Sequence, residues 1–215
     1  MDTLGSINEK TRQAYNLAAE KYHNLFHAEM EEKEYDRQLL DDFGREFAPG
    51  SFIADAGCGP SGHVGRYLFD KGLRVVGIDI SDRCVEMAAR FNPGMKFLCG
   101  DIGRMGLWEG CFQGLVSYYS IIHTPKRLVP KIFAEFSRVL APDGYLLVAV
   151  KAGSREGFQS ELLGIKAEIY FSFFDEYEIR NYFENAAFRV ELLHKRNPYA
   201  FELNNERIFA IGRKG

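Results

Sequence analysis

The sequence predicts an α/β fold: a doubly wound, mostly parallel sheet of seven strands with helices on both faces. Short apolar runs alternate with segments whose apolar residues recur at helical spacing. Strands that alternate with helices imply right-handed crossovers between parallel strands. The chain has 215 residues, 46% of them hydrophobic and 27% charged, which is enough for one domain with a buried core.

The first fifty residues differ from the rest. From Ile7 to Phe47 they are charged and helix-favouring, with apolar residues at helical spacing in two stretches. Pro49-Gly50 ends the second stretch. We therefore expect residues 1–50 to form a helical cap on one domain that spans residues 51–215.

The remaining elements follow in order along the chain. Ser81 is placed to cap the helix after the second strand, and Pro142-Asp143-Gly144 predicts a turn before the fifth. The last two strands are expected to close the far edge of the sheet as an antiparallel hairpin. The predicted strands are residues 51–56, 73–78, 95–98, 112–119, 145–150, 189–194 and 207–212, and the predicted helices are 64–71, 81–91, 130–140 and 175–186.

Composition and charge argue against several classes of protein. No apolar run approaches the ~18–20 residues that span a bilayer, and the N-terminus lacks the apolar stretch of a signal peptide. The net charge of -3 argues against a general nucleic-acid binder. Cysteines without paired spacing predict reduced thiols in a cytoplasmic protein; they are Cys58, Cys84, Cys99 and Cys111.

The sharpest motif is Asp55-Ala-Gly-Cys-Gly-Pro-Ser-Gly-His63, where the first strand is followed by a helix. Glycine at such a junction lets the backbone turn sharply and approach a ligand with no Cβ in the way. In a doubly wound sheet, a nucleotide-like ligand binds at this turn, beyond the carboxyl ends of the strands. A tight turn without a ligand is the alternative interpretation.

Two acidic residues follow the next two strands at the same edge. Asp79 ends the second strand about twenty residues after the glycines, where it can accept hydrogen bonds from both hydroxyls of a ribose. Asp101 lies in Gly100-Asp101-Ile102 and can accept from an adenine amine while Ile102 packs on the ring. Alternatively, Asp79 caps the following helix and Asp101 is a solvated turn residue.

These motifs, in this order, resemble the class I S-adenosylmethionine-dependent methyltransferases, in the small-molecule branch of the ubiquinone and menaquinone methyltransferases. The resemblance covers the chain from about Ser51 to the C-terminus. Further stretches carry it: Tyr15-Asn-Leu-Ala-Ala-Glu-Lys-Tyr22, Cys111-Phe-Gln-Gly-Leu-Val-Ser-Tyr-Tyr-Ser-Ile-Ile-His123, Phe136-Ser-Arg-Val-Leu-Ala-Pro-Asp-Gly-Tyr145, and Phe173-Phe-Asp-Glu176 followed by Ala187-Phe188.

The resemblance implies a Rossmann-like fold with an N-terminal helical lid and methyl transfer to a small-molecule acceptor by in-line displacement. The cofactor would be S-adenosyl-L-methionine and the product S-adenosyl-L-homocysteine, whereas the methylated atom, oxygen, nitrogen or carbon, stays open. The residues implied in cofactor binding are Tyr22, Asp55, Gly57, Cys58, Gly59, Asp79, Ile80, Gly100, Asp101, Ile102 and Tyr118.

Two departures from the family pattern bear on this interpretation. One extra residue between Gly59 and Gly62 alters the tight turn and leaves the role of Gly62 open. The fourth strand ends Ser117-Tyr-Tyr-Ser120, not in the Asn/Asp-Pro-Pro-aromatic sequence of enzymes that methylate amino groups of DNA bases or peptide glutamine. No Pro-Cys nucleophile motif for cytosine carbon is present either. A nucleic-acid acceptor is therefore not expected.

The acceptor chemistry points to the end of the fourth strand. His123 is the candidate base for an acceptor proton, and Tyr119 is the second candidate catalytic residue. His123 can instead shape the loop by hydrogen bonding. Tyr15 is, with Tyr22 and Tyr119, a candidate for aromatic contact with the sulfonium, or an ordinary core residue. His23 and His27 lie four apart on a helix but complete no ligand set, so no metal is expected.

Residues 152–174 are expected to enclose the acceptor together with the lid. Their aromatic residues favour a flat or apolar acceptor, and Arg155 is available to a carboxylate; the alternative is packing of the lid on the sheet. The aromatic residues are Phe158, Tyr170, Phe171 and Phe173. Two other functions stay open: a catalytically weak module that binds cofactor or a partner, and methyl transfer to a protein or peptide. Neither the acceptor nor the oligomeric state follows from the sequence.

Overall fold

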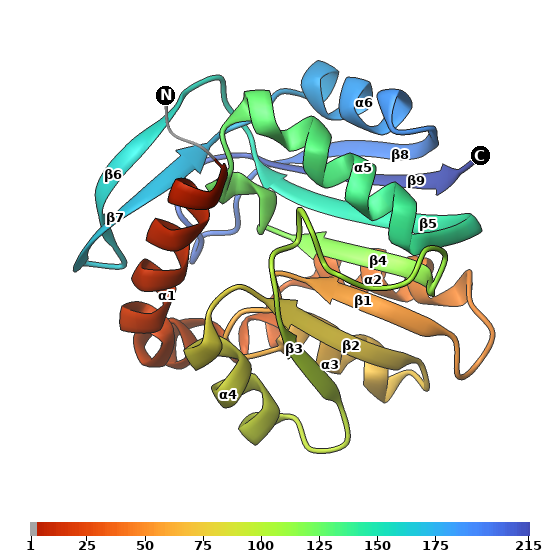
Figure 1. The fold of residues 1–215 in the computed structure, drawn as a ribbon, viewed down its shortest axis with the longest axis horizontal. Coiled ribbons are helices and arrows are strands. Elements are labelled where there is room, and N and C mark those ends of the chain that lie inside the picture. Colours follow the sequence, from red (N-terminus) through yellow and green to blue (C-terminus); the bar gives the residue numbers. More distant parts are fainter. Residues whose placement is uncertain (1–3) are drawn as a thin grey trace.

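The computed structural model describes residues 4–215, which form a seven-stranded sheet flanked by helices (Figure 1). Its order is β3-β2-β1-β4-β5-β9-β8, and β9 alone runs antiparallel to the other six strands. The predicted mostly parallel sheet and its antiparallel hairpin are confirmed. The strands are β1 (Phe52–Ala56), β2 (Arg74–Asp79), β3 (Lys96–Cys99), β4 (Phe112–Tyr118), β5 (Leu140–Lys151), β8 (Phe188–Arg196) and β9 (Arg207–Lys214).

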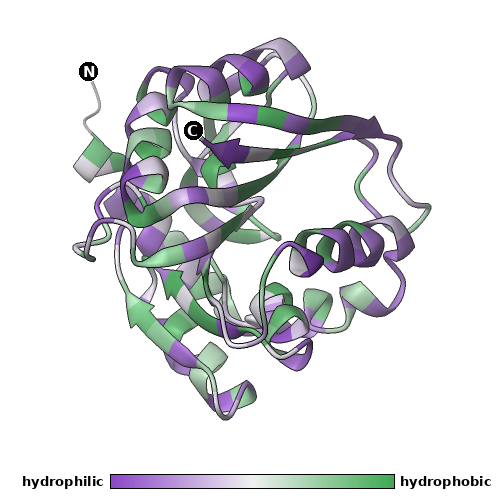
Figure 2. Ribbon diagram, turned by 90° about the vertical axis from the view of Figure 1, so that its right-hand side faces the viewer, coloured by the Kyte–Doolittle hydropathy of each residue, from purple (hydrophilic) through white to green (hydrophobic). Residues whose placement is uncertain are grey.

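Helices cover both faces of this sheet. On one face α2 and α3 contribute Phe43 and Leu68 to the core, and on the other α5 and α6 contribute Phe136 and Phe183. Figure 2 shows hydrophobic residues concentrated in the central strands and many hydrophilic residues on the surrounding helices. The helices are α1 (Leu4–Phe26), α2 (Glu34–Arg45), α3 (His63–Asp70), α4 (Asp82–Phe91), α5 (Val129–Val139) and α6 (Glu176–Asn185), with short 3-10 turns η1 (Glu29–Glu31), η2 (Ile121–His123) and η3 (Lys126–Leu128).

Local sequence signals explain where these helices begin. The Ser81 side chain accepts a hydrogen bond of 3.0 Å from the Cys84 N–H, so the predicted cap of α4 is confirmed. At α6, Asp175 and Glu178 each accept from the other's backbone N–H, which satisfies two donors that the helix itself leaves unpaired. Residues 1–3 of the predicted cap lie outside the described residues.

The chain between β5 and α6 forms a hairpin that the sequence analysis did not identify as strands. β6 (Glu156–Leu162) pairs with β7 (Ile165–Ser172) in a separate two-stranded sheet. One face of the hairpin packs against α1, where Leu162 and Ile169 meet Ala14 and Ala18 (Figure 1). This packing positions α1 along the carboxyl ends of the central strands, as the predicted lid requires.

The turn predicted before the fifth strand lies inside a longer strand. Between the pairs Phe112–Leu140 and Gly114–Tyr145 the ladder shifts register, and Asp143 has a left-handed backbone, with φ 62°. Pro142-Asp143-Gly144 therefore loops out of β5 without ending it. Among residues 4–215, no helix is both long and apolar enough to cross a membrane.

Candidate active site

A cavity of about 70 Å³ lies where β1, β2 and β4 end, beneath α1. Such a position, beyond the carboxyl ends of parallel strands, is where open α/β sheets bind ligands. The predicted residues that line it are Tyr22, Gly57, Gly59, Asp79, Ile80, Asp101, Ile102, Tyr118, Tyr119 and His123. The structure thus brings together residues from five separate stretches of the sequence.

The loop after β1 needs glycine for two reasons. Gly57 has φ 84°, and a Cβ at this position would lie 2.2 Å from the Cβ of Ser120. The N–H groups of Gly57 and Cys58 donate to the Ile78 carbonyl at 2.7 and 3.1 Å, which ties the loop to β2. Gly59, with φ 62°, then presents bare backbone to the cavity.

Asp79 is buried at the end of β2 and lines the cavity beside Ile80. One carboxylate oxygen accepts from the Gly59 N–H at 2.8 Å and the other from the Ser81 N–H at 2.9 Å. Burial raises the pKa of Asp79, although these hydrogen bonds oppose the shift. Each oxygen keeps a lone pair for a further donor in the cavity.

Asp101 follows β3 and is partly buried. Its Oδ1 accepts from the Gly103 N–H at 2.8 Å, and its Oδ2 accepts from the side-chain amide of Asn8 on α1 at 2.7 Å. Ile102 lines the cavity next to it. Gly100 is not among the lining residues; its N–H donates to the Asp79 carbonyl at 2.8 Å and fixes the approach to Asp101.

Asp55 and Cys58 also lie behind the cavity wall and do not line it. The Asp55 Oδ2 accepts from the Gly65 N–H at 2.9 Å, so the carboxylate stabilises the N-terminal turn of α3. Burial raises the pKa of Asp55 to about 6. The Cys58 thiol is buried towards Gly77 of β2, and burial raises its pKa well above the ordinary value. The cofactor contacts predicted for their side chains stay predictions.

Three tyrosines, Tyr22, Tyr118 and Tyr119, also line the cavity. Tyr118 donates its hydroxyl hydrogen to Asp36 of α2. Tyr119 has a left-handed backbone, with φ 55°, and its buried hydroxyl has no hydrogen-bond partner among the described residues. Such strain in a non-glycine residue persists where the surroundings enforce it, often at functional sites. The Tyr22 ring packs on Phe26, with ring centroids 4.6 Å apart.

His123 has both ring nitrogens occupied. Its Nδ1 lies 3.0 Å from the Tyr170 carbonyl oxygen, which can only accept, so Nδ1 carries a hydrogen. Its Nε2 therefore accepts from the Tyr15 hydroxyl at 2.8 Å. Burial, with a smaller contribution from the nearby positive charge of Lys151, lowers the pKa of His123 to about 4, although the hydrogen bond to the Tyr170 carbonyl opposes the shift. The imidazole is neutral, with its lone pair on the side of the cavity lined by Tyr15.

Polar contacts at three positions along helix α1 hold it on the strand ends. Besides the Asn8–Asp101 and Tyr15–His123 hydrogen bonds, Asn16 contacts Ser81 and Asp82 at 2.5 and 2.8 Å. The sequence analysis did not single out Asn8, Thr11 or Ser120, although all three line the cavity. Positions 8, 11, 15 and 22 share one face of a helix, and that spacing was the available signal.

The other sequence candidates lie away from the cavity. The His23 and His27 rings stack, 5.0 Å between centroids, and His27 Nδ1 lies 3.0 Å from the His23 carbonyl oxygen. Within residues 4–215 no group of three or more His, Cys, Asp or Glu side chains is placed to hold a metal ion. Arg155 is exposed, and its guanidinium lies 4.9 Å from the centre of the Phe173 ring.

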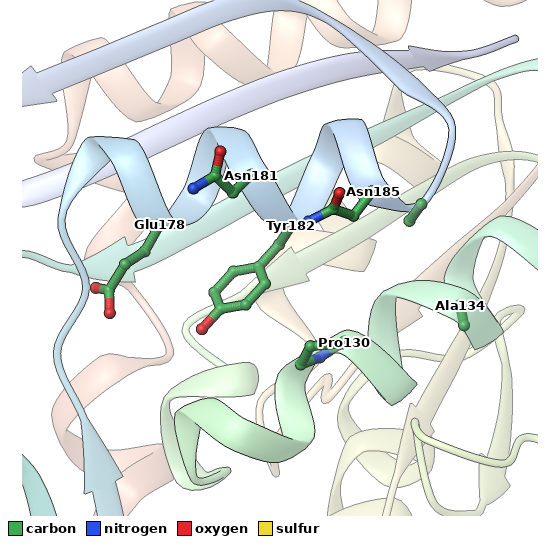
Figure 3. Close-up of a pocket in the computed structure, with 7 residues that line it drawn as sticks. Pro130, Ala134, Glu178, Asn181, Tyr182 and Asn185 are labelled. Carbon is green, nitrogen blue, oxygen red and sulfur yellow. The ribbon is translucent and has the colours of Figure 1, made fainter.

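A second cavity, of about 240 Å³, lies between α5 and α6 (Figure 3). Tyr182 and Pro130 face each other across it, and Glu178 stands at one end. Two of its polar groups have partners: Glu178 accepts from the Lys126 ammonium at 2.7 Å, and Tyr182 donates to the Lys126 carbonyl at 3.3 Å. None of the predicted site residues lines this cavity.

Comparison with known proteins agrees with this geometry. Residues 54–148 match the model of a family described as a methyltransferase domain. The chain is 32% identical over 119 residues to 24-methylenesterol C-methyltransferase 2 of Arabidopsis thaliana, covering 53% of this chain and 32% of the relative. It is 30% identical over 149 residues to the probable tRNA methyltransferase 9B of Homo sapiens, covering 65% and 31%. The chain thus spans about a third of the length of these relatives.

The fold has a full-length counterpart among solved structures. Magnesium protoporphyrin IX methyltransferase from Synechocystis PCC 6803, crystallised with bound S-adenosylmethionine, superposes with a TM-score of 0.73 at 16% identity and covers 100% of both chains. The matched segment runs from β1 into β5 and contains the glycine loop, Asp79, Asp101 and His123. The chain therefore has the fold of this methyltransferase, and its residues 54–148 match a methyltransferase domain.

Proposed function

We propose that this protein transfers the methyl group of S-adenosyl-L-methionine to a small-molecule acceptor and releases S-adenosyl-L-homocysteine. The observation that carries the proposal is the cavity at the strand ends, where bare glycine backbone and two carboxylates face a single helix. The sulfonium of the cofactor supplies an activated methyl carbon, so the chain's own task is to align the acceptor and to exclude water, worth ~7–11 kcal/mol of the barrier in good geometry.

The cofactor-binding residues have separate roles. Asp79 would accept from the ribose hydroxyls, because both of its oxygens are already oriented by backbone N–H groups. Asp101 would accept from the adenine amine, with Ile80 and Ile102 packing on the ring. Gly59 leaves room for close approach, since a Cβ there would meet only the Tyr22 ring, at 3.8 Å. These features fit the cofactor.

His123 would take the proton of the acceptor. Its neutral Nε2 lone pair becomes available when the acceptor replaces the Tyr15 hydroxyl, while the Nδ1 hydrogen bond to the Tyr170 carbonyl keeps the ring orientation. As the bond from the acceptor atom to the methyl carbon forms, the carbon–sulfur bond breaks and its electron pair stays on sulfur. The acceptor proton moves to Nε2, and Tyr119 lines the same wall.

The first experiment combines cofactor binding with label transfer. Calorimetric titration with S-adenosylhomocysteine should show binding that Asp79→Ala weakens about 10- to 150-fold, the loss of hydrogen bonds to a charged group worth roughly 1.5–3 kcal/mol. Asp70→Ala is the matched control, because Asp70 forms an exposed ion pair with Arg66. Folded protein that binds no S-adenosylhomocysteine at high micromolar concentration would contradict the proposal.

Methyl-labelled cofactor, incubated with the protein and a metabolite extract, then identifies the acceptor class. Label in a small-molecule fraction supports the proposal. Label in tRNA would favour a nucleic-acid acceptor. The similarity to a probable tRNA methyltransferase supports such an acceptor, whereas the net charge of -3 argues against it. Tight cofactor binding without any transfer would favour a binding module.

We place this reaction in a reducing compartment such as the cytoplasm. The four cysteines are free, two of them buried, and burial raises the pKa of the Cys84 thiol above its ordinary value. Such thiols are unreactive and are typical of proteins that carry no disulfides.

A further inference from the structure

Beyond the ends of β4 and β5, charged side chains form a buried cluster next to the cavity. Glu202 lies at its centre, 2.7 Å from Arg196, 3.2 Å from Lys33 and 3.8 Å from Arg207. Each cation in the cluster has at least one carboxylate within ion-pair distance. The cluster, called here the Glu202 cluster, consists of Glu29, Lys33, Asp36, Arg196, Glu202 and Arg207.

Lys151 lies beside this cluster but has no such partner. Among residues 4–215 no carboxylate lies within ion-pair distance of its ammonium and no hydrogen bond engages it; its contact is the Phe171 ring, 5.5 Å from nitrogen to ring centre. Burial, with smaller contributions from the positive charges of Arg207 and Lys33, lowers the pKa of Lys151 to about 8, although the negative charge of Glu202 opposes the shift. The side chain is therefore a partly buried cation without a carboxylate in ion-pair contact.

The surroundings of Lys151 connect it to the acceptor side of the cavity. The Phe171 ring, which makes the cation–π contact with the Lys151 ammonium, also packs edge-on against the His123 ring, with 4.7 Å between the ring centroids. Lys151 pairs across the sheet with Arg207, whose guanidinium lies 5.9 Å from the centre of the Tyr119 ring. His123 and Tyr119 both line the cavity, whereas Lys151 and Phe171 reach it only through these neighbours. The buried Tyr119 hydroxyl lacks a partner among the described residues.

An unpaired cation in such surroundings is costly, because burial removes water that would otherwise solvate it. Three cations of the cluster are matched by three carboxylates, so the excess positive charge at this wall resides on Lys151. A bound anion would remove that cost, and perturbed, unpaired charges in clefts are typical of binding sites.

We infer that Lys151 binds an anionic oxygen of the methyl acceptor, so that the substrate is an acidic molecule, a carboxylate or a phenolate. The inference rests on the proposed function and specifies its substrate class. It also replaces Arg155, the cation that the sequence suggested, because Arg155 is exposed and stacked on Phe173.

The position of Lys151 in the sheet favours contact with the acceptor over contact with the cofactor. Lys151 ends β5, whereas Gly59, Asp79 and Asp101, which are proposed to bind the cofactor, lie at or after the ends of β1, β2 and β3. The methionine carboxylate of the cofactor is the competing anion. A lysine that bound this carboxylate would change affinity for S-adenosylhomocysteine, whereas a lysine that binds the acceptor would not.

The test compares benzoate with benzamide, a neutral probe of the same shape, on protein saturated with S-adenosylhomocysteine. Saturation-transfer NMR or calorimetry gives the dissociation constants. We expect benzoate to bind the wild type at least tenfold more tightly than benzamide, and Lys151→Met to abolish this preference. Lys151→Arg should retain it. Lys131→Met, which removes an exposed lysine of α5, should change neither probe.

Two results would overturn the inference. Equal affinity of the wild type for both probes, including no measurable affinity for either, means that no anion site exists at this wall. Loss of S-adenosylhomocysteine affinity in Lys151→Met, with the protein folded, would assign the lysine to the cofactor instead. Failure of the proposed function looks different, because wild-type protein would then not bind S-adenosylhomocysteine at all. A phenolate acceptor is distinguished by repeating the comparison with 4-nitrophenolate.

Discussion

The two halves of the site are built in different ways. In the half proposed to bind the cofactor (Gly57, Gly59, Asp79 and Asp101; the cofactor half), backbone N–H groups next to the strand ends orient both carboxylates. In the half proposed to bind the acceptor (Tyr119, His123, Lys151 and Phe171; the acceptor half), side chains are positioned by segments far apart in the sequence, as when Tyr15 and Tyr170 hold His123. The cofactor half is therefore specified locally, and the acceptor half by tertiary packing.

The largest effect is expected for the acceptor half. His123→Gln should lower the rate of label transfer about 10²- to 10⁴-fold, the usual contribution of a general base, with S-adenosylhomocysteine affinity unchanged. Because the pKa of His123 is about 4, the wild-type rate should not fall through protonation of this group between pH 8 and 5. A parallel loss of turnover and cofactor affinity would show that His123 serves the structure of both halves.

Glu202→Gln tests how strongly the buried charges hold the acceptor wall. Removing one partner of a buried ion pair costs about 3–5 kcal/mol in the free energy of unfolding. Glu191→Gln, which alters an ion pair with the exposed Arg189, should cost less than about 0.5 kcal/mol. Denaturant titration of the three proteins gives both values, and similar losses in the two variants would contradict the assignment.

The same carboxyl predicts a dependence on pH. Burial opposes ionisation of Glu202, yet the hydrogen bonds from Arg196 and the Tyr199 N–H, with the charges of Lys33 and Arg207, lower its pKa to about 2. A lowered pKa contributes stability that is fully present above about pH 4.5 and is lost as the pH falls towards 2. The difference in the free energy of unfolding between the wild type and Glu202→Gln should therefore decrease as the pH falls over that range.

Gly57→Ala tests whether the cofactor half depends on its local backbone. The added Cβ would meet Ser120 at 2.2 Å and sit at φ 84°, so we expect about 2–5 kcal/mol of destabilisation from overpacking and strain together, and loss of cofactor binding. Gly72 has nearly the same φ, 88°, with open space around it. Gly72→Ala should therefore be destabilised by the backbone strain alone, about 1–2 kcal/mol. Equal destabilisation of the two variants would show that the contact with Ser120 does not contribute.

The smallest effect concerns the contact that joins α1 to the acceptor half. Tyr15→Phe keeps the ring against His123 but removes a hydrogen bond, worth about 0.5–1.5 kcal/mol. We expect S-adenosylhomocysteine to associate faster, measured by stopped flow, because α1 then opens more readily. Tyr177→Phe, at an exposed position on α6, is the control. An unchanged association rate would mean that α1 does not gate the cavity.

The same division decides what the sequence could predict. The glycine loop, Asp79 and Asp101 carry local signals, and all four residues line the cavity. Lys151 carries none, because its significance depends on the absence of a carboxylate that only the packing of β5, β7 and β9 reveals. The β6–β7 hairpin did have a signal, since Ile165, Ala167, Ile169 and Phe171 alternate on one face. No strand is predicted for residues 152–174 from the sequence.

Asp55 and Cys58 show that membership in the glycine motif does not predict which side chains of the cofactor half face the cavity. Both lie within the glycine motif, yet one carboxylate oxygen of Asp55 binds the start of α3 and the Cys58 thiol faces β2. Proximity in sequence to a ligand-binding turn does not determine which side of the strand a side chain occupies, because successive residues point to opposite faces.

The β6–β7 hairpin forms its hydrogen-bond ladder only within itself and joins the central sheet through a single bridge between Ala152 and Phe174. One wall of the acceptor half, including Phe171, therefore sits on a segment whose replacement would leave the seven-stranded ladder intact. Exchange of this segment would therefore alter the proposed acceptor wall and keep the central sheet, provided that the new segment preserves the packing of Leu162 and Ile169 against α1. The central sheet and the surface proposed to select the acceptor can thus evolve at different rates.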